Sequence, residues 1–434
     1  MCPREVLENQ GMRTPDQHNQ FWTLGLLVVC VALPWLNPFA SSPSTAVIPL
    51  LVSWMLASCA LLLMVDLPFA ISSRAQPRAL LTGLLCVWLA ASVLWVPDVI
   101  DRALTAGLLA ALVCVWLMIE LGRRAAVPST GLLMWVVGAW VLAAAVSSVL
   151  GVLQYLGLAR ELSPWVNQPL KGDAFANLRQ RNQFASLTSL GLVALLGWVA
   201  VRAKAQSMTR GCWTLAFVLL NVLAAGVACS VSRTGAVQWA LVGVLMAAWG
   251  WRSAKQDAAF GKGLVWLALA APVLVAVWSV WMPLLALQIT GEQGASMILR
   301  VTGQAQDYAA CGGRRVLWTN VLALITQHPW LGWGWGETDY AHFMTGYNTL
   351  RFCDMLDNAH DFPLHLALEL GVPFAVAVMA LVGVWAWRRT PWREQHAWRV
   401  MAWCLLVVLG LHSLLEYPLW YGPFQMTLGL AIGV

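Results

Sequence analysis

The sequence predicts an all-α membrane protein, a polytopic bundle of about twelve transmembrane helices with a large loop between the ninth and the tenth. Of the 434 residues, 60% are hydrophobic and only 11% are charged, whereas soluble domains carry roughly 25% charged residues. A chain so poor in charge cannot cover its surface with polar groups, so that surface must face lipid. The 27 tryptophans fit the same class, because indole rings favour the boundary between water and hydrocarbon.

The individual spans follow from apolar runs that are long enough to cross a bilayer. A hydrocarbon core of about 30 Å needs roughly 20 apolar residues, and a helix satisfies its own backbone groups where water is absent. We expect spans near 21–38, 46–65, 79–97, 103–121, 130–156, 183–201, 212–229, 235–251, 263–289, 362–387 and 399–416. A twelfth begins near Phe424 and reaches Val434 before it can cross, so we expect an incomplete last helix or a truncated chain.

These spans divide the chain into four segments. Residues 1–20 form a polar tail, and the apolar run that follows lacks a small-residue cleavage site, so we expect it to remain as an anchor. Residues 21–289 hold the first nine helices and residues 362–434 hold the last three, with the final one incomplete. Between them, residues 290–361 form the large loop that we expect to carry the function.

Basic residues predict which ends of the helices face the cytoplasm, because short cytoplasmic loops are enriched in Lys and Arg. Alternate connections hold most of the 26 basic residues. We therefore place the tail on the cytoplasmic side and the loop at 290–361 on the outer side. The net charge of +6 reflects this topology and does not indicate nucleic-acid binding. The basic residues of the predicted inner side are Arg4, Arg13, Arg74, Arg78, Arg123, Arg124, Arg202, Lys204, Arg210, Arg252, Lys255, Lys262, Arg388, Arg389, Arg393 and Arg399.

The outer side nevertheless carries several arginines, which is unusual for a side normally depleted of them. Arg233 lies between two apolar runs, close to membrane level, where an unpaired guanidinium costs a few kcal/mol. It is either a snorkelling interfacial residue or a fork that grips a phosphate in bidentate fashion. For the set as a whole we favour an anionic lipid headgroup. The other members are Arg179, Arg181, Arg300, Arg314, Arg315 and Arg351.

The first dense segment of the large loop begins at Arg314. Residues 314–327 have the spacing of an amphipathic helix, with an apolar face at Val316, Trp318 or Asn320, Leu322 and Ile325. Pro329 and alternating glycines then end it. The alternation of Trp and Gly at 330–336 is either a surface on which sugar rings stack or an interfacial anchor.

The second dense segment, residues 357–363, precedes the tenth span. Asp361 is a candidate N-cap and Pro363 suits the first helical turn, so His360 should lie at the outer mouth of the bundle. An imidazole titrates near neutrality and can accept a proton from a hydroxyl, although a lone histidine is more often structural. Asp357 and Asp361 flank it and could orient the ring.

Two further pairs share a spacing of four residues and therefore one helix face. His365 and Glu369 fall inside the tenth span, and His412 and Glu416 fall at the outer end of the eleventh. We expect the second pair, with Tyr421, to support the site or receive the acceptor; an interfacial aromatic belt is the alternative. No metal signature is present, and the cluster of acids near 354–361 is explained equally well by a helix start.

Two of the ten cysteines differ from the rest. Most cysteines fall in apolar runs and are interpreted as small hydrophobic residues, but Cys311 and Cys353 lie in the large loop. They pair if the loop faces an oxidising compartment, and two free thiols are an equal alternative.

Several of these motifs together resemble the O-antigen ligase and polymerase superfamily, most closely its bacterial protein O-oligosaccharyltransferases (pilin glycosylation ligases). The resemblance covers about residues 175–421, and the first five spans add only hydrophobicity. The motifs are Arg314-x-x-x-Trp318, His328-Pro329-Trp330-Leu331-Gly332-x-Gly334, Asn358-Ala359-His360-Asp361, Glu369-x-Gly371, Leu178-Arg179-Gln180-Arg181-Asn182-Gln183 and His412 to Tyr421.

The resemblance implies transfer of a preassembled glycan from undecaprenyl pyrophosphate to a hydroxyl, without a metal or another cofactor. The acceptor would be Ser or Thr of a pilin-like periplasmic protein. By position, His360 matches the essential loop histidine, and Arg233 and Arg314 match the phosphate-contacting arginines. Arg181 and Asn182 fall on a motif whose middle residue varies, which makes Arg181 the less secure match.

Other functions remain open at this point. An O-antigen ligase acting on the lipid A-core glycolipid, or an O-antigen polymerase, differs only in its acceptor. A transporter of lipid-linked glycan should carry several carboxylates inside the membrane or broken helices at its middle, and the polar residues here cluster outside instead. A non-catalytic scaffold would tolerate changes in the loop.

Overall fold

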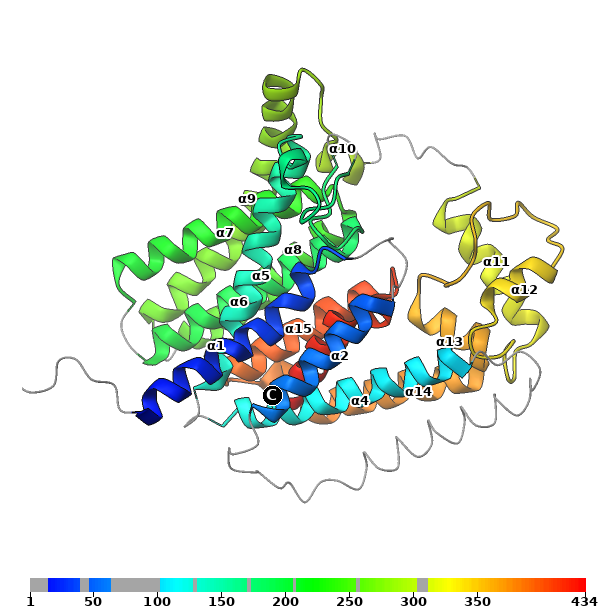
Figure 1. Cartoon of the computed structure of the whole chain (residues 1–434), viewed down its shortest axis with the longest axis horizontal. Coiled ribbons are helices and arrows are strands. Elements are labelled where there is room, and N and C mark those ends of the chain that lie inside the picture. Colours follow the sequence, from blue (N-terminus) through cyan, green and yellow to red (C-terminus); the bar gives the residue numbers. More distant parts are fainter. Residues whose placement is uncertain are drawn as a thin grey trace, which may run out of the picture.

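A computed structural model of the chain describes residues 15–39, 47–63, 102–127, 131–169, 173–205, 208–254, 258–302 and 311–434. Every regular element in these ranges is a helix, which confirms the all-α fold class. Figure 1 shows a large bundle and, to one side of it, a smaller group formed by α11, α12 and α13. We call residues 311–371 the lobe.

The bundle contains ten helices of the described ranges, and short helices mark several connections. α10 (Met297–Val301), η2 (Arg160–Leu162), η3 (Pro391–Arg393) and η4 (Pro418–Trp420) are the short ones. The bundle helices are α1 (Pro15–Leu36), α2 (Val47–Leu62), α4 (Arg102–Ala125), α5 (Leu132–Tyr155), α6 (Arg181–Ala205), α7 (Arg210–Ser230), α8 (Arg233–Ala254), α9 (Ala258–Thr290), α15 (Ala397–Ser413) and α16 (Gly422–Gly433).

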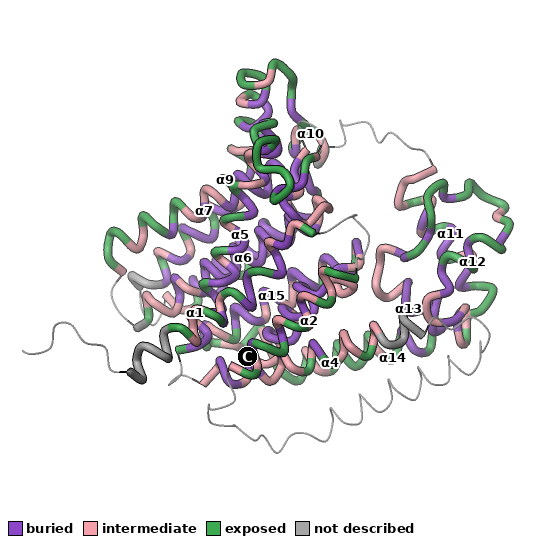
Figure 2. The backbone as a smooth tube through the Cα atoms, in the orientation of Figure 1, coloured by how far each residue is buried: buried purple, intermediate pink, exposed green. Residues whose placement is uncertain are grey.

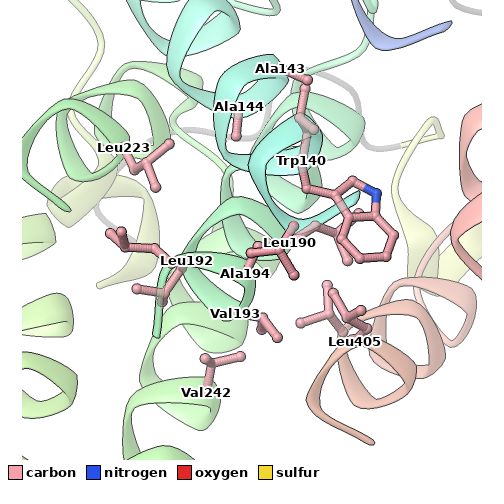
Figure 3. Close-up of a cluster of buried hydrophobic side chains, with 14 of the residues drawn as sticks. Trp140, Ala143, Ala144, Leu190, Leu192, Val193, Ala194, Leu223, Val242 and Leu405 are labelled. Carbon is pink, nitrogen blue, oxygen red and sulfur yellow. The ribbon is translucent and has the colours of Figure 1, made fainter. Parts of the chain in front are cut away.

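Helix α6 forms the centre of the bundle and packs against α5, α7, α8 and α15. Its most apolar stretch is 89% buried, the largest share among the five helices that are long and apolar enough to span a membrane in the described residues. Figure 3 shows Leu190 and Val193 of α6 close to Trp140 of α5 and Leu405 of α15. Small residues allow this close packing, because a side chain at Gly191 would overlap the methyl group of Ala144.

The described helices follow the predicted spans closely, although the predicted total of twelve spans is not confirmed. Five helices meet the length and composition of a membrane span, and three shorter apolar helices accompany them in the described ranges. The chain is thus a multi-pass membrane protein. The expected span at 79–97 lies outside the described residues, as do Arg4, Arg13, Arg74, Arg78 and Lys255.

The tenth predicted span is not one helix. It begins as α13 (Phe362–Leu370), breaks at Gly371, and continues as α14 (Val372–Arg389). The two halves have different surroundings: residues 365–370 of α13 are all buried, whereas only 11% of the most apolar stretch of α14 is buried. Figure 2 shows buried residues gathered inside the bundle around α5, α6 and α15, whereas most residues of α14 are exposed, which suits contact with lipid.

The ends of the helices agree with the predicted alternation of sides. Lys204, in the last turn of α6, donates to the carbonyl of Gln395 at 3.3 Å, and Arg252 of α8 donates to the carbonyl of Trp392. Three connections predicted to share the cytoplasmic side therefore meet at one end of the bundle. Which end faces the cytoplasm remains a prediction.

The lobe has its own hydrophobic core, built from α11 (Arg314–Gln327), α12 (Thr338–Met344), α13 and the start of α14. The amphipathic helix predicted at 314–327 is confirmed, and Asn320 and Ile325 of its predicted face are buried, but Leu322 is not. Leu317, Val321 and Leu324 are buried, whereas Leu322 is 52% exposed. Asn320, on the buried face, donates to the Leu350 carbonyl and accepts from the amide of Phe352.

A disulfide and a set of backbone hydrogen bonds hold the lobe together. Cys311 and Cys353 are bonded, which closes the choice left open by the sequence. The segment of alternating Trp and Gly lies against the α13–α14 break, where the amide of Trp333 donates to the Leu368 carbonyl at 2.9 Å. Trp333 packs on the lobe core rather than forming a free stacking face, and Trp330 is 75% exposed.

Candidate active site

Three side chains from different parts of the chain converge on the carboxylate of Glu416, which follows the end of α15. His360 of the lobe lies with Nδ1 2.6 Å from Glu416 Oε2. Arg314, the first residue of α11, forms an ion pair with Oε1. Asn182 of α6 donates from Nδ2 to the same Oε1 at 2.8 Å. Both carboxylate oxygens are therefore engaged at the junction between lobe and bundle.

The network extends into the bundle through Asn182. Its carbonyl oxygen accepts a hydrogen bond from the hydroxyl of Ser232 at 2.6 Å. Ser232 precedes α8 and caps it, because its Oγ accepts from the amide of Gly235 at 3.2 Å. The starts of α6 and α8 are thus tied to each other and, through Glu416, to the start of α11.

The local structure around His360 is fixed from both sides. Asp361 caps α13 by accepting from the amide of Leu364 at 2.9 Å, as the sequence predicted. On the other side, the Asn358 side chain accepts from the His360 amide at 2.9 Å. His360 has a φ of +51°, a left-handed conformation that costs a residue with a side chain roughly 1–2 kcal/mol. The surrounding contacts hold the ring where it meets Glu416.

The electrostatics of Glu416 favour the ionised carboxylate. Burial by itself would raise the pKa of this group, but the hydrogen bond with His360 and the charges of His360 and Arg314 outweigh it and hold the pKa below its usual range. An ionised carboxylate only accepts hydrogen bonds. His360 must then donate from Nδ1, and in the neutral imidazole the Nε2 lone pair can accept a proton.

Three predicted phosphate-binding arginines share one unusual position. Arg181, Arg233 and Arg314 are the first residues of α6, α8 and α11. Arg181 also approaches Asp173 at 3.7 Å, and Arg233 is exposed beside Ser232. The hydrogen-bonded network therefore links the neighbours of two of these arginines to the third.

The remaining predicted residues surround the same point without touching His360, except through aromatic contacts. Tyr421 stacks on Tyr417 with ring centres 5.8 Å apart, and Tyr417 meets the His360 ring edge-on at 4.9 Å. His412 is fully buried in α15 and packs against Phe424. The partner of His360 is Glu416, whereas Asp361 serves as a helix cap and Asp357 is exposed.

Two residues near the site were not predicted from the sequence. Ser232 immediately precedes the predicted Arg233, and Asp173 lies in a loop with no motif. Trp420, inside the predicted motif from His412 to Tyr421, packs its ring 5.0 Å from His365 and joins the connection after α15 to the lobe. A signal was present for Ser232, since a serine three residues before an amide in a new helix is a typical cap.

The predicted pair His365 and Glu369 does form in the lobe, with Nε2 and Oε2 3.4 Å apart. Glu369 also accepts from the hydroxyl of Thr338 at 2.7 Å. Both side chains are buried. The pair therefore belongs to the lobe core and is separate from the Glu416 network.

Comparisons with known proteins match three ranges of the chain. Residues 215–378 match the O-antigen ligase family, residues 174–198 match the protein glycosylation ligase family, and residues 400–434 match the C-terminal region of a membrane-bound polymerase described as a virulence factor. The matched ranges include His360, Arg314, Arg233, Asn182 and Glu416.

A curated relative covers almost the whole chain. The chain is 23% identical over 430 residues to a protein of Acinetobacter baylyi named general O-oligosaccharyltransferase. The aligned region is 96% of this chain and 70% of that relative. The resemblance seen in the sequence is thereby confirmed, and these likenesses to O-antigen ligases and an oligosaccharyltransferase support a glycan-transferring enzyme.

Proposed function

We propose that this enzyme transfers a preassembled glycan from undecaprenyl diphosphate to a hydroxyl group of an acceptor protein, on the periplasmic face of the bacterial inner membrane. The observation that carries the proposal is the convergence of three helix starts, each with an arginine as first residue, beside a histidine whose Nε2 is left to accept a proton.

Arginine is a poor first residue for an isolated helix. The N-terminus of a helix carries about half a positive charge, and a cation there is unfavourable by roughly 0.3–1 kcal/mol. The same N-terminus binds anions well, because its amide groups and its dipole point at the ligand. Three such starts, linked through Asn182, Ser232 and Glu416, therefore support a site for a ligand with several negative charges. A diphosphate has that character.

The proposed reaction is a single displacement. The acceptor oxygen attacks the anomeric carbon of the glycan, the bond from that carbon to the phosphate oxygen breaks, and undecaprenyl diphosphate leaves with both electrons. The acceptor proton goes to His360 Nε2. The arginines stabilise the charge that develops on the leaving diphosphate. A single displacement inverts the configuration at the anomeric carbon, which nuclear magnetic resonance of the product can check.

The relatives support a protein as the acceptor. The match at residues 174–198 to protein glycosylation ligases and the name of the Acinetobacter relative support Ser or Thr of a protein, such as a pilin. The polymerase match at residues 400–434 supports a second candidate, in which the acceptor is another glycan chain. A lipid A-core acceptor belongs to the same chemistry.

The site is tested by reconstituted transfer from lipid-linked glycan, with matched variants of adjacent arginines. Arg314→Ala should lower transfer by at least about 10²-fold, and His360→Ala by about 10²- to 10⁴-fold, because each removes a group acting in the transition state. Arg315→Ala is the control, since Arg315 is the exposed neighbour of Arg314. Near-normal transfer by both Arg314→Ala and His360→Ala would rule out this mechanism.

The acceptor is tested separately in cells from which the gene has been deleted and in the same cells after complementation. A mass increase of a pilin or another periplasmic protein supports the main proposal, whereas a change in the lipopolysaccharide ladder supports the glycolipid or polymerase alternative. Movement of labelled lipid-linked glycan across vesicles without a covalent product would instead support a transporter.

A further inference from the structure

Glu416 occupies the position where its negative charge conflicts with the proposed donor. Its carboxylate is only 8% exposed and pairs with Arg314, the cation that the proposed function assigns to the diphosphate. A diphosphate arriving at Arg314 meets a like charge a few ångströms away, and that repulsion is strong where solvent is scarce. Glu416 therefore opposes donor binding as long as it holds Arg314.

The same carboxylate serves His360 through its other oxygen. Oε2 lies 2.6 Å from His360 Nδ1, while Arg314 and Asn182 share Oε1. A carboxylate that hydrogen-bonds one imidazole nitrogen fixes the tautomer and makes the other nitrogen more basic. The effect on His360 is diluted as long as a guanidinium neutralises the carboxylate.

The two contacts compete for one charge. Arg314 is 37% exposed in its side chain, and so can turn toward a ligand, whereas His360 is held by the Asn358 contact and the Asp361 cap on either side of it. If Arg314 turns to the diphosphate, Glu416 keeps its hydrogen bonds with His360 and Asn182 and no longer pairs with a guanidinium.

We propose that the Glu416 carboxylate pairs with Arg314 until the donor diphosphate replaces it there. Glu416 then acts as a positioning residue for His360. Donor binding then prepares the base, so the acceptor hydroxyl is activated when the glycan is in place. This inference rests on the proposed function. Because coupling is reciprocal, anything that strengthens the contact between Glu416 and His360 also favours donor binding.

The test separates binding from turnover. Glu416→Gln keeps the size of the side chain and removes its charge. We expect the purified full-length variant to bind farnesyl diphosphate, a soluble isoprenoid diphosphate, about tenfold more tightly than the wild type in calorimetric titration. We expect its kcat with lipid-linked glycan to fall by about 10- to 100-fold, as for other residues that orient a functional histidine. Binding and turnover should therefore move in opposite directions.

The double variant Arg314→Ala with Glu416→Gln closes the cycle. If Glu416 weakens donor binding by holding Arg314, the tenfold gain from Glu416→Gln must vanish when Arg314 is absent. Glu161→Gln, at an exposed carboxylate of η2, is the control and should leave both quantities unchanged. If Glu416→Gln does not fold, Glu416→Asp should show the same two signs, with smaller changes, because its shorter side chain spans Arg314 and His360 poorly.

Unchanged or weaker binding of farnesyl diphosphate by the folded Glu416 variant would overturn the inference, as would a gain that persists without Arg314. Failure of the proposed function gives a different result. In that case the wild type itself would not bind the diphosphate through Arg314, and Arg314→Ala alone would have no effect on binding.

Discussion

The bundle and the lobe are held together in different ways. The bundle relies on close side-chain packing of a large apolar core, with α6 at its centre. The lobe has a much smaller core and adds a disulfide, a buried asparagine and a direct docking of backbone on backbone. The candidate site lies between them, so it forms only when the lobe is rigid enough to present Arg314 and His360 to Glu416.

The largest expected effect is a loss of lobe stability when a glycine is replaced where residues 330–336 contact the α13–α14 break. Gly371 has a φ of +90° and a ψ of 156°, a region open essentially to glycine alone, and an added Cβ would overlap the Trp330 carbonyl. Gly332 has a φ of +71°, and its added Cβ would overlap the Glu369 carbonyl. We expect Gly371→Ala and Gly332→Ala each to destabilise the lobe by about 3 kcal/mol or more and to abolish transfer.

The control for these variants lies in the same lobe. Gly346 has open space around its Cβ position, so Gly346→Ala should leave thermal unfolding and transfer nearly unchanged. Proteolysis of the detergent-solubilised protein locates the damage, which should appear in residues 311–371. Equal loss of protection in the bundle would break the distinction between the two regions.

An intermediate effect is expected from the disulfide. The bond joins residues 42 apart in sequence, and removal of a cross-link closing a loop of that size costs about 2–4 kcal/mol. Cys311→Ser and Cys353→Ser should lower the unfolding temperature of the lobe and reduce transfer, and the double variant should be no worse than either alone. Cys59→Ser, at an exposed free cysteine of α2, should change neither quantity.

The smallest effect is a pH dependence confined to the lobe. Burial and the charges of Asp339 and Glu369 raise the pKa of Glu337 from 4.5 to about 7. The folded lobe therefore retains a proton that the unfolded chain releases, so this group favours folding most below about pH 4.5, and its contribution is lost as the pH rises to about 7.

Glu337→Gln should therefore flatten the decline in unfolding temperature between pH 5 and 7, a change of about 2–4 °C in a scan followed by lobe proteolysis. Asp354→Asn, at an exposed acid of the same lobe, should retain the wild-type slope. A wild-type lobe whose stability rises over that interval would contradict the raised pKa of Glu337.

The sequence predicted the features that depend on local pattern. Hydrophobic runs located most of the described helices, and the Asp361 cap and the start of α11 at Arg314 followed from neighbouring residues. Long-range features were beyond its reach. Nothing local pairs His360 with Glu416, 56 residues away, and the pattern at 362–387 is continuous although the helix breaks at Gly371. That break depends on the Trp330 carbonyl, which occupies the space a side chain would need.

The same break also affects how the membrane acts on the enzyme. A continuous helix over residues 362–389 would be roughly 40 Å long. Any tilt of its lipid-exposed part would then move His360, which lies just before its first residue, by several ångströms. The break at Gly371 is held by the 2.8 Å hydrogen bond from the Val372 amide to the Pro329 carbonyl. We expect α14 to tilt about this point when the bilayer thickness fluctuates, while His360 keeps its position beside Glu416.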